Sequence, residues 1–342
     1  MSASAPEYSD QNVQQGVLNR LRGLLSKQKL GEKARHVRVI INPAAGRGEP
    51  ILKIMNSAFQ AANVDWEVSI TKEAGDGFQL AKKAVSQGVD VVAVHGGDGT
   101  INEVARALMG TEIPLAIIPG GTGNVMAKEI GLTNDLAFAC ALAANSEADI
   151  QLVDMGKING HCFLLRAGMG MEATMVKGAD REKKDRLGAF AYLLAAFEAM
   201  SDPPIAQYTM NLDGEEITTE GLTCVIANSG ILGRYGFSIA PHISIQDGFL
   251  DVIVIRKADL PSLLSLAASM VGGEENPDNL LHWQVRQASI DAEPQQLVQV
   301  DGEIIADSPV SVEIVPQALH LIVPSEENAG QGNQAQELEE EQ

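Results

Sequence analysis

Between residues 37 and 132, short apolar runs alternate with segments whose apolar residues recur at helical spacing. The runs VRVIINP, DVVAVH and PLAIIP are typical of strands, because they are rich in Val and Ile and end at Pro or Gly. Segments such as ILKIMNSAFQAAN and TINEVARALM lie between them and have the periodicity of amphipathic helices. Strands that alternate with helices usually pair in parallel, so this part of the chain predicts an α/β domain with a parallel sheet.

The pattern changes after about Asp149. Runs such as GLTCVIANS, LDVIVIRK and SVEIVPQALHLIVP are separated by frequent turn signals, which predicts a mainly antiparallel β-sandwich. We therefore expect an N-terminal extension at residues 1–36, the α/β domain at 37–150, the β-rich domain at 151–324, and a disordered acidic tail at 325–342. Within the extension, apolar residues at 13–25 recur at helical spacing among basic ones, which suits either an interfacial membrane helix or a helix packed on the protein.

The charge balance argues against one class of partner. The chain has 25 Lys and Arg against 45 Asp and Glu, a net charge of −20, whereas sequence-independent nucleic-acid binding draws its free energy from basic residues. We expect no nucleic-acid partner. The three cysteines are odd in number and widely spaced, which indicates reduced core residues. No signal peptide or membrane-spanning run is apparent, so a cytoplasmic protein is expected, with peripheral association at the inner face of the membrane left open.

Three glycine-rich loops follow predicted strands, at the edge of the sheet where α/β folds bind ligands. They are NPAAG at 42–46, GGDGT at 96–100 and PGGTGN at 119–124. Glycine leaves room for a polyphosphate to approach backbone N–H groups, and the N-terminus of a following helix attracts anions. Turn conformation and helix capping explain any single loop equally well. Three such loops in succession predict a phosphate-binding site.

The ordered loops, with INEV directly after GGDGT, resemble the catalytic domain of diacylglycerol kinases, sphingosine kinases and their bacterial lipid kinase relatives. DGFLD at 247–251 and DGE at 301–303 resemble later segments of the same family, so the similarity runs from about Val37 to Pro324. NAD kinases share GGDGT more distantly, but their resemblance stops short of the later segments. Bacterial diacylglycerol kinases often have Asp where Val125 stands here, which leaves the acceptor lipid open.

This resemblance implies an ATP-dependent kinase with Mg²⁺ as cofactor, a lipid acceptor at the membrane surface and an active site in a cleft between two domains. The residues implied are Asp98 and Glu303 as catalytic carboxylates, Asn42 and Thr71 as nucleotide contacts, Gly97, Asp98, Gly99 and Thr100 around the phosphates, Thr122 and Asn124 lining the cleft, and Asp247 as a ligand of a structural Mg²⁺. The chemistry is consistent, because phosphoryl transfer needs positioning, charge neutralisation and a carboxylate to accept the hydroxyl proton.

Simpler interpretations stay open for individual residues. Asp98 suits a helix N-cap, Glu303 a hairpin position, and Asp247 a plain Asp-Gly turn. Two other functions also remain: an enzyme like NAD kinase with a soluble acceptor, and a non-catalytic module that binds nucleotide or lipid. The match to GxGxxA at 168–173 lies outside the α/β repeat, and GxxxxGK[ST] is absent, so neither a Rossmann site nor a P-loop is expected.

Overall fold

The computed structural model describes residues 35–46, 48–170, 205–232, 237–238, 242–256 and 280–325. The chain divides into two compact units. Unit 1 comprises residues 1–121, 130–151 and 320–342, and unit 2 comprises residues 122–129 and 152–319. The amphipathic helix expected at 13–25 and the acidic tail from residue 326 onward lie outside the described residues.

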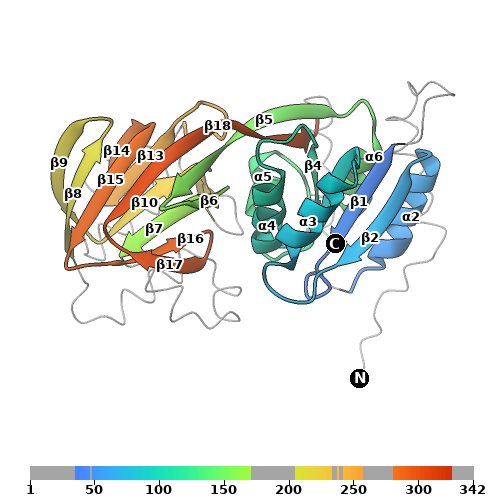
Figure 1. The fold of residues 1–342 in the computed structure, drawn as a ribbon, viewed down its shortest axis with the longest axis horizontal. Coiled ribbons are helices and arrows are strands. Elements are labelled where there is room, and N and C mark those ends of the chain that lie inside the picture. The colour runs from blue at the N-terminus through green and yellow to red at the C-terminus, as the bar shows by residue number, and fades with distance from the viewer. Residues whose placement is uncertain are drawn as a thin grey trace, which may run out of the picture. The chain divides into compact units, whose positions relative to one another are not determined.

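Unit 1 is built on a parallel sheet with the strand order β2-β1-β3-β4. Figure 1 labels β1, β2 and β4 of this sheet. The strands are β1 (His36–Ile41), β2 (Asp65–Ile70), β3 (Val91–Gly96) and β4 (Leu115–Pro119). The helices are α2 (Ile51–Ala61), α3 (Asp76–Ser86), α4 (Asp98–Leu108) and α6 (Leu136–Ala144). They pack in two pairs, α2 with α6 and α3 with α4. The predicted α/β architecture is confirmed.

The burial of these strands follows from their place in the sheet. β3 and β4 are buried along their whole length, as expected for central parallel strands covered by helices, and this is why they appear as continuous apolar runs. β2 lies at the edge and is largely exposed, including Val68 and Ile70. The carboxyl ends of β1, β3 and β4 therefore carry the three glycine-rich loops on a rigid, buried support.

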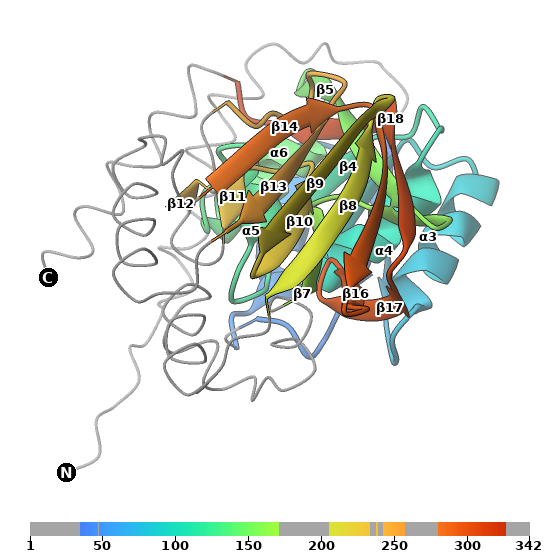
Figure 2. The ribbon, with the colours of Figure 1, turned by 90° about the vertical axis from the view of Figure 1, so that its left-hand side faces the viewer.

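Unit 2 is mainly antiparallel (Figures 1 and 2). It contains α5 (Val125–Glu129) and the strands β5 (Asp149–Ile158), β6 (His161–Phe163), β7 (Arg166–Gly170), β8 (Ala206–Leu212), β9 (Glu215–Gly221), β10 (Thr223–Ala227), β11 (Ile231–Leu232), β12 (Phe237–Ser238), β13 (Leu250–Ile255), β14 (Leu280–Val285), β15 (Gln287–Glu293), β16 (Leu297–Val300), β17 (Glu303–Asp307) and β18 (Val310–Val323). One sheet has the order β14-β13-β10-β7-β16-β17, and the other runs β18-β15-β8-β9.

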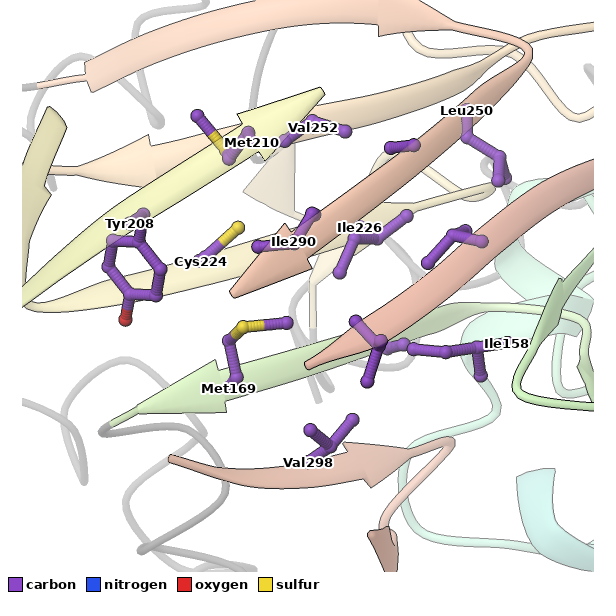
Figure 3. Close-up of a cluster of buried hydrophobic side chains, with 14 of the residues drawn as sticks. Ile158, Met169, Tyr208, Met210, Cys224, Ile226, Leu250, Val252, Ile290 and Val298 are labelled. Carbon is purple, nitrogen blue, oxygen red and sulfur yellow. The ribbon is translucent and has the colours of Figure 1, made fainter. Parts of the chain in front are cut away.

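The core of unit 2 lies between these two sheets. Tyr208, Met210 and Ile290 from one sheet pack in a single buried cluster with Met169 and Ile226 from the other (Figure 3). Alternate residues of β8 and β15 are buried, which is the period of a strand with one face on a core. The predicted antiparallel sandwich is therefore confirmed.

The chain passes from unit 1 to unit 2 within β5 and returns within β18, where Leu321 pairs in parallel with Leu115 of β4. All three cysteines are free thiols, and Cys140 and Cys224 are buried. Among the described residues, no helix has the length and hydropathy needed to cross a lipid bilayer.

Candidate functional site

The GGDGT loop joins β3 to α4 in unit 1. Gly97 is the N-cap of α4, and Asp98 is the first helical residue. The side chain of Thr100 is buried and accepts a hydrogen bond of 2.9 Å from the amide of Asn42. Asn42 also donates its backbone N–H to the carbonyl of His95. These bonds hold the first glycine-rich loop against the second.

The third glycine-rich loop joins the same edge of the sheet. The N–H of Gly46 donates to the carbonyl of Gly120, and the N–H of Gly120 donates to the carbonyl of Gly96. Thr71, buried at the end of β2, donates its N–H to the carbonyl of Ile41, directly before Asn42. Within unit 1 the structure thus brings together Asn42, Thr71 and residues 97–100 of the predicted nucleotide site.

His95 organises this edge and was not singled out from the sequence. Its ring is buried at the end of β3, and its Nδ1 lies 3.2 Å from the Ile118 carbonyl oxygen, so Nδ1 carries the proton. A Cβ placed on Gly120 would lie 2.7 Å from His95 Cε1. Burial lowers the pKa of His95, which favours the neutral ring. The sequence signal was a single imidazole in an otherwise apolar strand, VVAVH.

The loop after Thr71 is held by two carboxylates. Asp76 accepts hydrogen bonds from the N–H groups of Lys72 and Glu73, and these bonds lower its pKa. Glu103, the acid of INEV, accepts from the N–H groups of Gly75 and Gly77 at 2.8 and 2.9 Å. Glu103 therefore joins the start of α3 to α4. Its place in the motif is explained by this structural contact.

The glycines of the three loops fall into two kinds. At Gly96 an added Cβ would lie 2.8 Å from Thr100 Cβ, and at Gly120 it would meet the His95 ring, so packing requires glycine at both positions. Among the described residues, an added Cβ at Gly99 would meet nothing within 4 Å, and one at Gly97 would meet only Gly121 Cα, at 3.5 Å. Neither Gly97 nor Gly99 has a positive φ. Neither the backbone nor the packing of unit 1 therefore requires glycine at 97 or 99. The space beside these two glycines lies at the N-terminus of α4, where phosphate oxygens bind favourably.

The rest of the PGGTGN loop belongs to unit 2. Thr122 is exposed, whereas Asn124 is buried with a φ of 47°, a left-handed conformation that Asn adopts more readily than most residues. α5 follows and is attached to the segment after β10, because Glu129 accepts from the Ser229 hydroxyl and the Ile231 N–H. Burial raises the pKa of Glu129.

Three aspartates lie around the DGFLD segment in unit 2. Asp247 accepts from the N–H of Phe249 and from the side-chain amide of Gln284. Asp154 is buried and accepts from the N–H of Gly248 at 2.7 Å. Burial, followed by the charges of Asp251 and Asp154, raises the pKa of Asp247. This accumulation of negative charge suits a hard cation, although the described residues contain no group of three His, Cys, Asp or Glu arranged to hold a metal.

Glu303 is the exposed first residue of β17 and pairs with Val300 of β16. The turn before it is anchored by Asp301, whose carboxylate accepts hydrogen bonds from the N–H groups of Leu164, Leu165 and Arg166 at 2.9, 3.1 and 2.9 Å. Burial of the carboxylate raises its pKa to about 6, against the opposing effect of these donors. Asp98 and Glu303 belong to different units, so their joint role in catalysis remains a prediction.

The raised pKa of Asp301 predicts a pH-dependent stability. The folded pKa of about 6 lies above the ordinary 3.8, so the protonated carboxyl stabilises the fold fully below the lower value, and that contribution is lost as the pH rises through the upper one. Asn at this position does not titrate. We expect the melting temperature of the wild type minus that of Asp301→Asn to be larger at about pH 5 than at about pH 7. Calorimetry of both proteins measures it; a constant difference would contradict the raised pKa.

Two protein families match nearly all of the described chain. The diacylglycerol kinase catalytic domain matches residues 36–158. The YegS C-terminal NAD kinase beta sandwich-like domain matches residues 166–323. This chain belongs to the family of diacylglycerol kinase-like lipid kinases. The resemblance drawn from the three loops, DGFLD and DGE is thereby confirmed over the range expected from the sequence.

Proteins from several bacteria are similar to the chain over most of its length. An uncharacterized protein of Synechocystis sp. is 32% identical over 89% of this chain and 72% of its own length. A diacylglycerol kinase of Bacillus subtilis is 27% identical over 85% of this chain and 97% of its own. The crystal structure of a diacylglycerol kinase from Bacillus anthracis is 25% identical, has a TM-score of 0.69, and covers 86% of this chain and 98% of the other.

Proposed function

We propose that this protein transfers the γ-phosphate of ATP to the hydroxyl of a lipid, diacylglycerol or a related one. The observation that carries the proposal is the space beside Gly97 and Gly99, which the fold leaves open at the N-terminus of α4. Backbone N–H groups at a helix N-terminus bind phosphate. A relative from Bacillus subtilis named diacylglycerol kinase supports the acceptor class.

In this proposal, Asn42 and Thr71 contact the nucleotide and residues 97–100 surround its phosphates. Thr122 and Asn124 are assigned to the same site through the family resemblance. The lipid hydroxyl oxygen bonds to the γ-phosphorus of ATP, and the bond between that phosphorus and ADP breaks. The carboxylate of Asp98 accepts the proton that the hydroxyl loses. Glu303 supports the same proton transfer. These roles are assigned through the family and await the mutants described below.

Bound Mg²⁺ would neutralise charge on the phosphates. Asp247 is the proposed ligand of a separate structural ion, together with main-chain carbonyls, since hard cations prefer oxygen donors. A lipid acceptor also implies that the enzyme works at a membrane surface. We propose that the enzyme attaches peripherally to the membrane, and that the amphipathic segment at residues 13–25 is the part that binds it.

One assay tests the proposed reaction. The protein is incubated with Mg²⁺, γ-labelled ATP and one acceptor at a time: detergent-dispersed diacylglycerol, sphingosine, a total lipid extract, or NAD as a soluble acceptor. Label in a lipid phosphate supports the proposal, and the identity of the product names the acceptor. Label in NADP alone would establish the NAD kinase alternative. ATP binding without transfer to any of these acceptors would indicate a non-catalytic module.

Gly99→Ala tests the observation that carries the proposal. A methyl group at Gly99 meets no atom of the described part of the chain within 4 Å. Ala is also the better helix former, so the melting temperature should stay level or rise. If phosphate oxygens fill this space, crowding of about 1–3 kcal/mol should raise the ATP KM by roughly 5- to 150-fold. Gln60→Ala, at an exposed helical position of unit 1, is the control. An unchanged ATP KM in Gly99→Ala would place the phosphates elsewhere.

A further inference from the structure

The motif Asp-Gly-Glu occurs twice in unit 2, at 213–215 and at 301–303. Both copies form hairpin turns of the same conformation. The aspartates have φ values of 51° and 44°, and the glycines that follow have 99° and 92°. Each glutamate is the exposed first residue of the next strand, β9 or β17. Two positive φ angles in succession define the tight turn that matches strand twist.

The hydrogen bonds around the two turns also correspond. The N–H of Asp213 donates to the Gln287 carbonyl, and its carboxylate accepts from the N–H groups of Arg286 and Gln287. The N–H of Asp301 donates to the Arg166 carbonyl, and its carboxylate accepts from three consecutive N–H groups at 164–166. In both turns the glycine N–H donates to a side-chain amide oxygen two residues before the aspartate, from Asn211 or Gln299.

Both hairpins need such an anchor, because their second strands lie at sheet edges. Among the described strands, β9 ends one sheet and pairs only with β8, while β17 ends the other and pairs only with β16. The β16–β17 pairing is also irregular at Val298 and Gln299. An edge strand held by one irregular partner has few contacts that define its position. The carboxylate bonds to 164–166 attach the start of β17 to the segment that leads into β7.

We propose that Asp301 is a positioning residue for Glu303: its carboxylate holds the turn against the backbone of 164–166 and thereby fixes the place of the Glu303 side chain. The turn at 213–215 has the same aspartate anchor, but the glutamate that follows it has no proposed catalytic role. This inference rests on the proposed function, in which Glu303 supports phosphoryl transfer. It assigns to Asp301 an effect on turnover that Asp213, with equivalent bonds, does not have.

The test compares matched variants of the full chain. Asp301→Asn keeps a carbonyl oxygen that can accept two of the three bonds, and Asp301→Ala removes all three; Asp213→Asn and Asp213→Ala make the same changes at the other turn. We expect kcat to fall in the order wild type, Asp301→Asn, Asp301→Ala, reaching roughly 10- to 100-fold, the size of loss that a misplaced catalytic group causes. The ATP KM should stay within about twofold, since Glu303 is not a proposed nucleotide contact. The Asp213 variants should lose thermal stability while kcat stays near normal.

Glu303→Gln and Glu215→Gln distinguish a failure of the positioning role of Asp301 from a failure of the catalytic role proposed for Glu303. Glu303→Gln should lower kcat and Glu215→Gln should not. Asp301→Ala placed in the Glu303→Gln background should cause little further loss, because residues that act as a unit are not additive. Full activity of Glu303→Gln would overturn the catalytic role of Glu303. An impaired Glu303→Gln beside an unimpaired Asp301→Ala would overturn the positioning role alone, as would an equal loss of kcat in Asp213→Ala.

Discussion

Asp98→Asn should lower kcat by roughly 10²-fold or more while the protein stays folded, since a positioned general base typically contributes that much. Asn matches Asp in size but cannot accept the hydroxyl proton. Asp98 is the half-buried first residue of α4, and Asn has about the same helix propensity as Asp. The ATP KM should change far less than kcat, because the neighbouring N–H groups stay in place. Steady-state kinetics and a melting curve of the variant measure both effects.

Asp135→Asn is the matched control for this variant. Asp135 is the N-cap of α6 in the same unit and accepts a hydrogen bond of 3.0 Å from the N–H of Phe138. Asn caps helices about as well as Asp, so this variant should keep both its melting temperature and its kcat. If Asp98→Asn turned over at a near-normal rate, Asp98 would be a structural residue of the first turn of α4 rather than the base.

Gly120→Ala should damage both the fold and nucleotide binding. The new Cβ would lie 2.7, 3.0 and 3.1 Å from three atoms of the buried His95 ring. Overpacking of this kind costs about 1–3 kcal/mol, which corresponds to a fall of several degrees in melting temperature. Because Gly120 bonds to both Gly46 and Gly96, its displacement should disturb all three loops. We expect ATP affinity to fall roughly tenfold or more.

Removing the His95 ring tests whether a clash with it causes the effect of Gly120→Ala. His95→Ala/Gly120→Ala should melt closer to His95→Ala than the sum of the single effects predicts, because the second change no longer meets a clash. Gly97→Ala is the control for an added methyl group, since its Cβ would meet only Gly121 Cα at an ordinary 3.5 Å. Strictly additive melting temperatures across the cycle would show that the His95 ring is not what requires glycine at 120.

Most of the architecture was readable from the sequence, because it depends on local pattern. Covered parallel strands appear as continuous apolar runs, and β8 and β15 alternate because one face meets a core. The glycine-rich loops at strand ends and the order of the later segments were enough to indicate the family. Those signals are carried by residues near one another in the chain, where spacing alone limits the conformations available.

The assignment of roles among similar residues could not be read from the sequence. DGE is the same three letters at 213–215 and 301–303, and only the family's order of motifs favoured the second copy. The glycines of GGDGT also look alike in the sequence. In the structure, Thr100 leaves no room for a side chain at Gly96, whereas no atom of the described residues crowds Gly99. Glu103 was part of a motif string before its bonds to Gly75 and Gly77 were known.

Local sequence patterns were enough to predict the two kinds of sheet, the glycine-rich loops and the family, since hydrophobic periodicity and turn chemistry act over a few residues. Tertiary structure alone decided that His95 lies beneath Gly120, and that the carboxylate of Asp301 accepts from N–H groups 135–137 positions earlier in the chain. Burial and hydrogen-bond partners set the pKa of Asp301 and the room beside Gly99. Both depend on which distant segments the fold brings into contact, and spacing along the chain does not encode that.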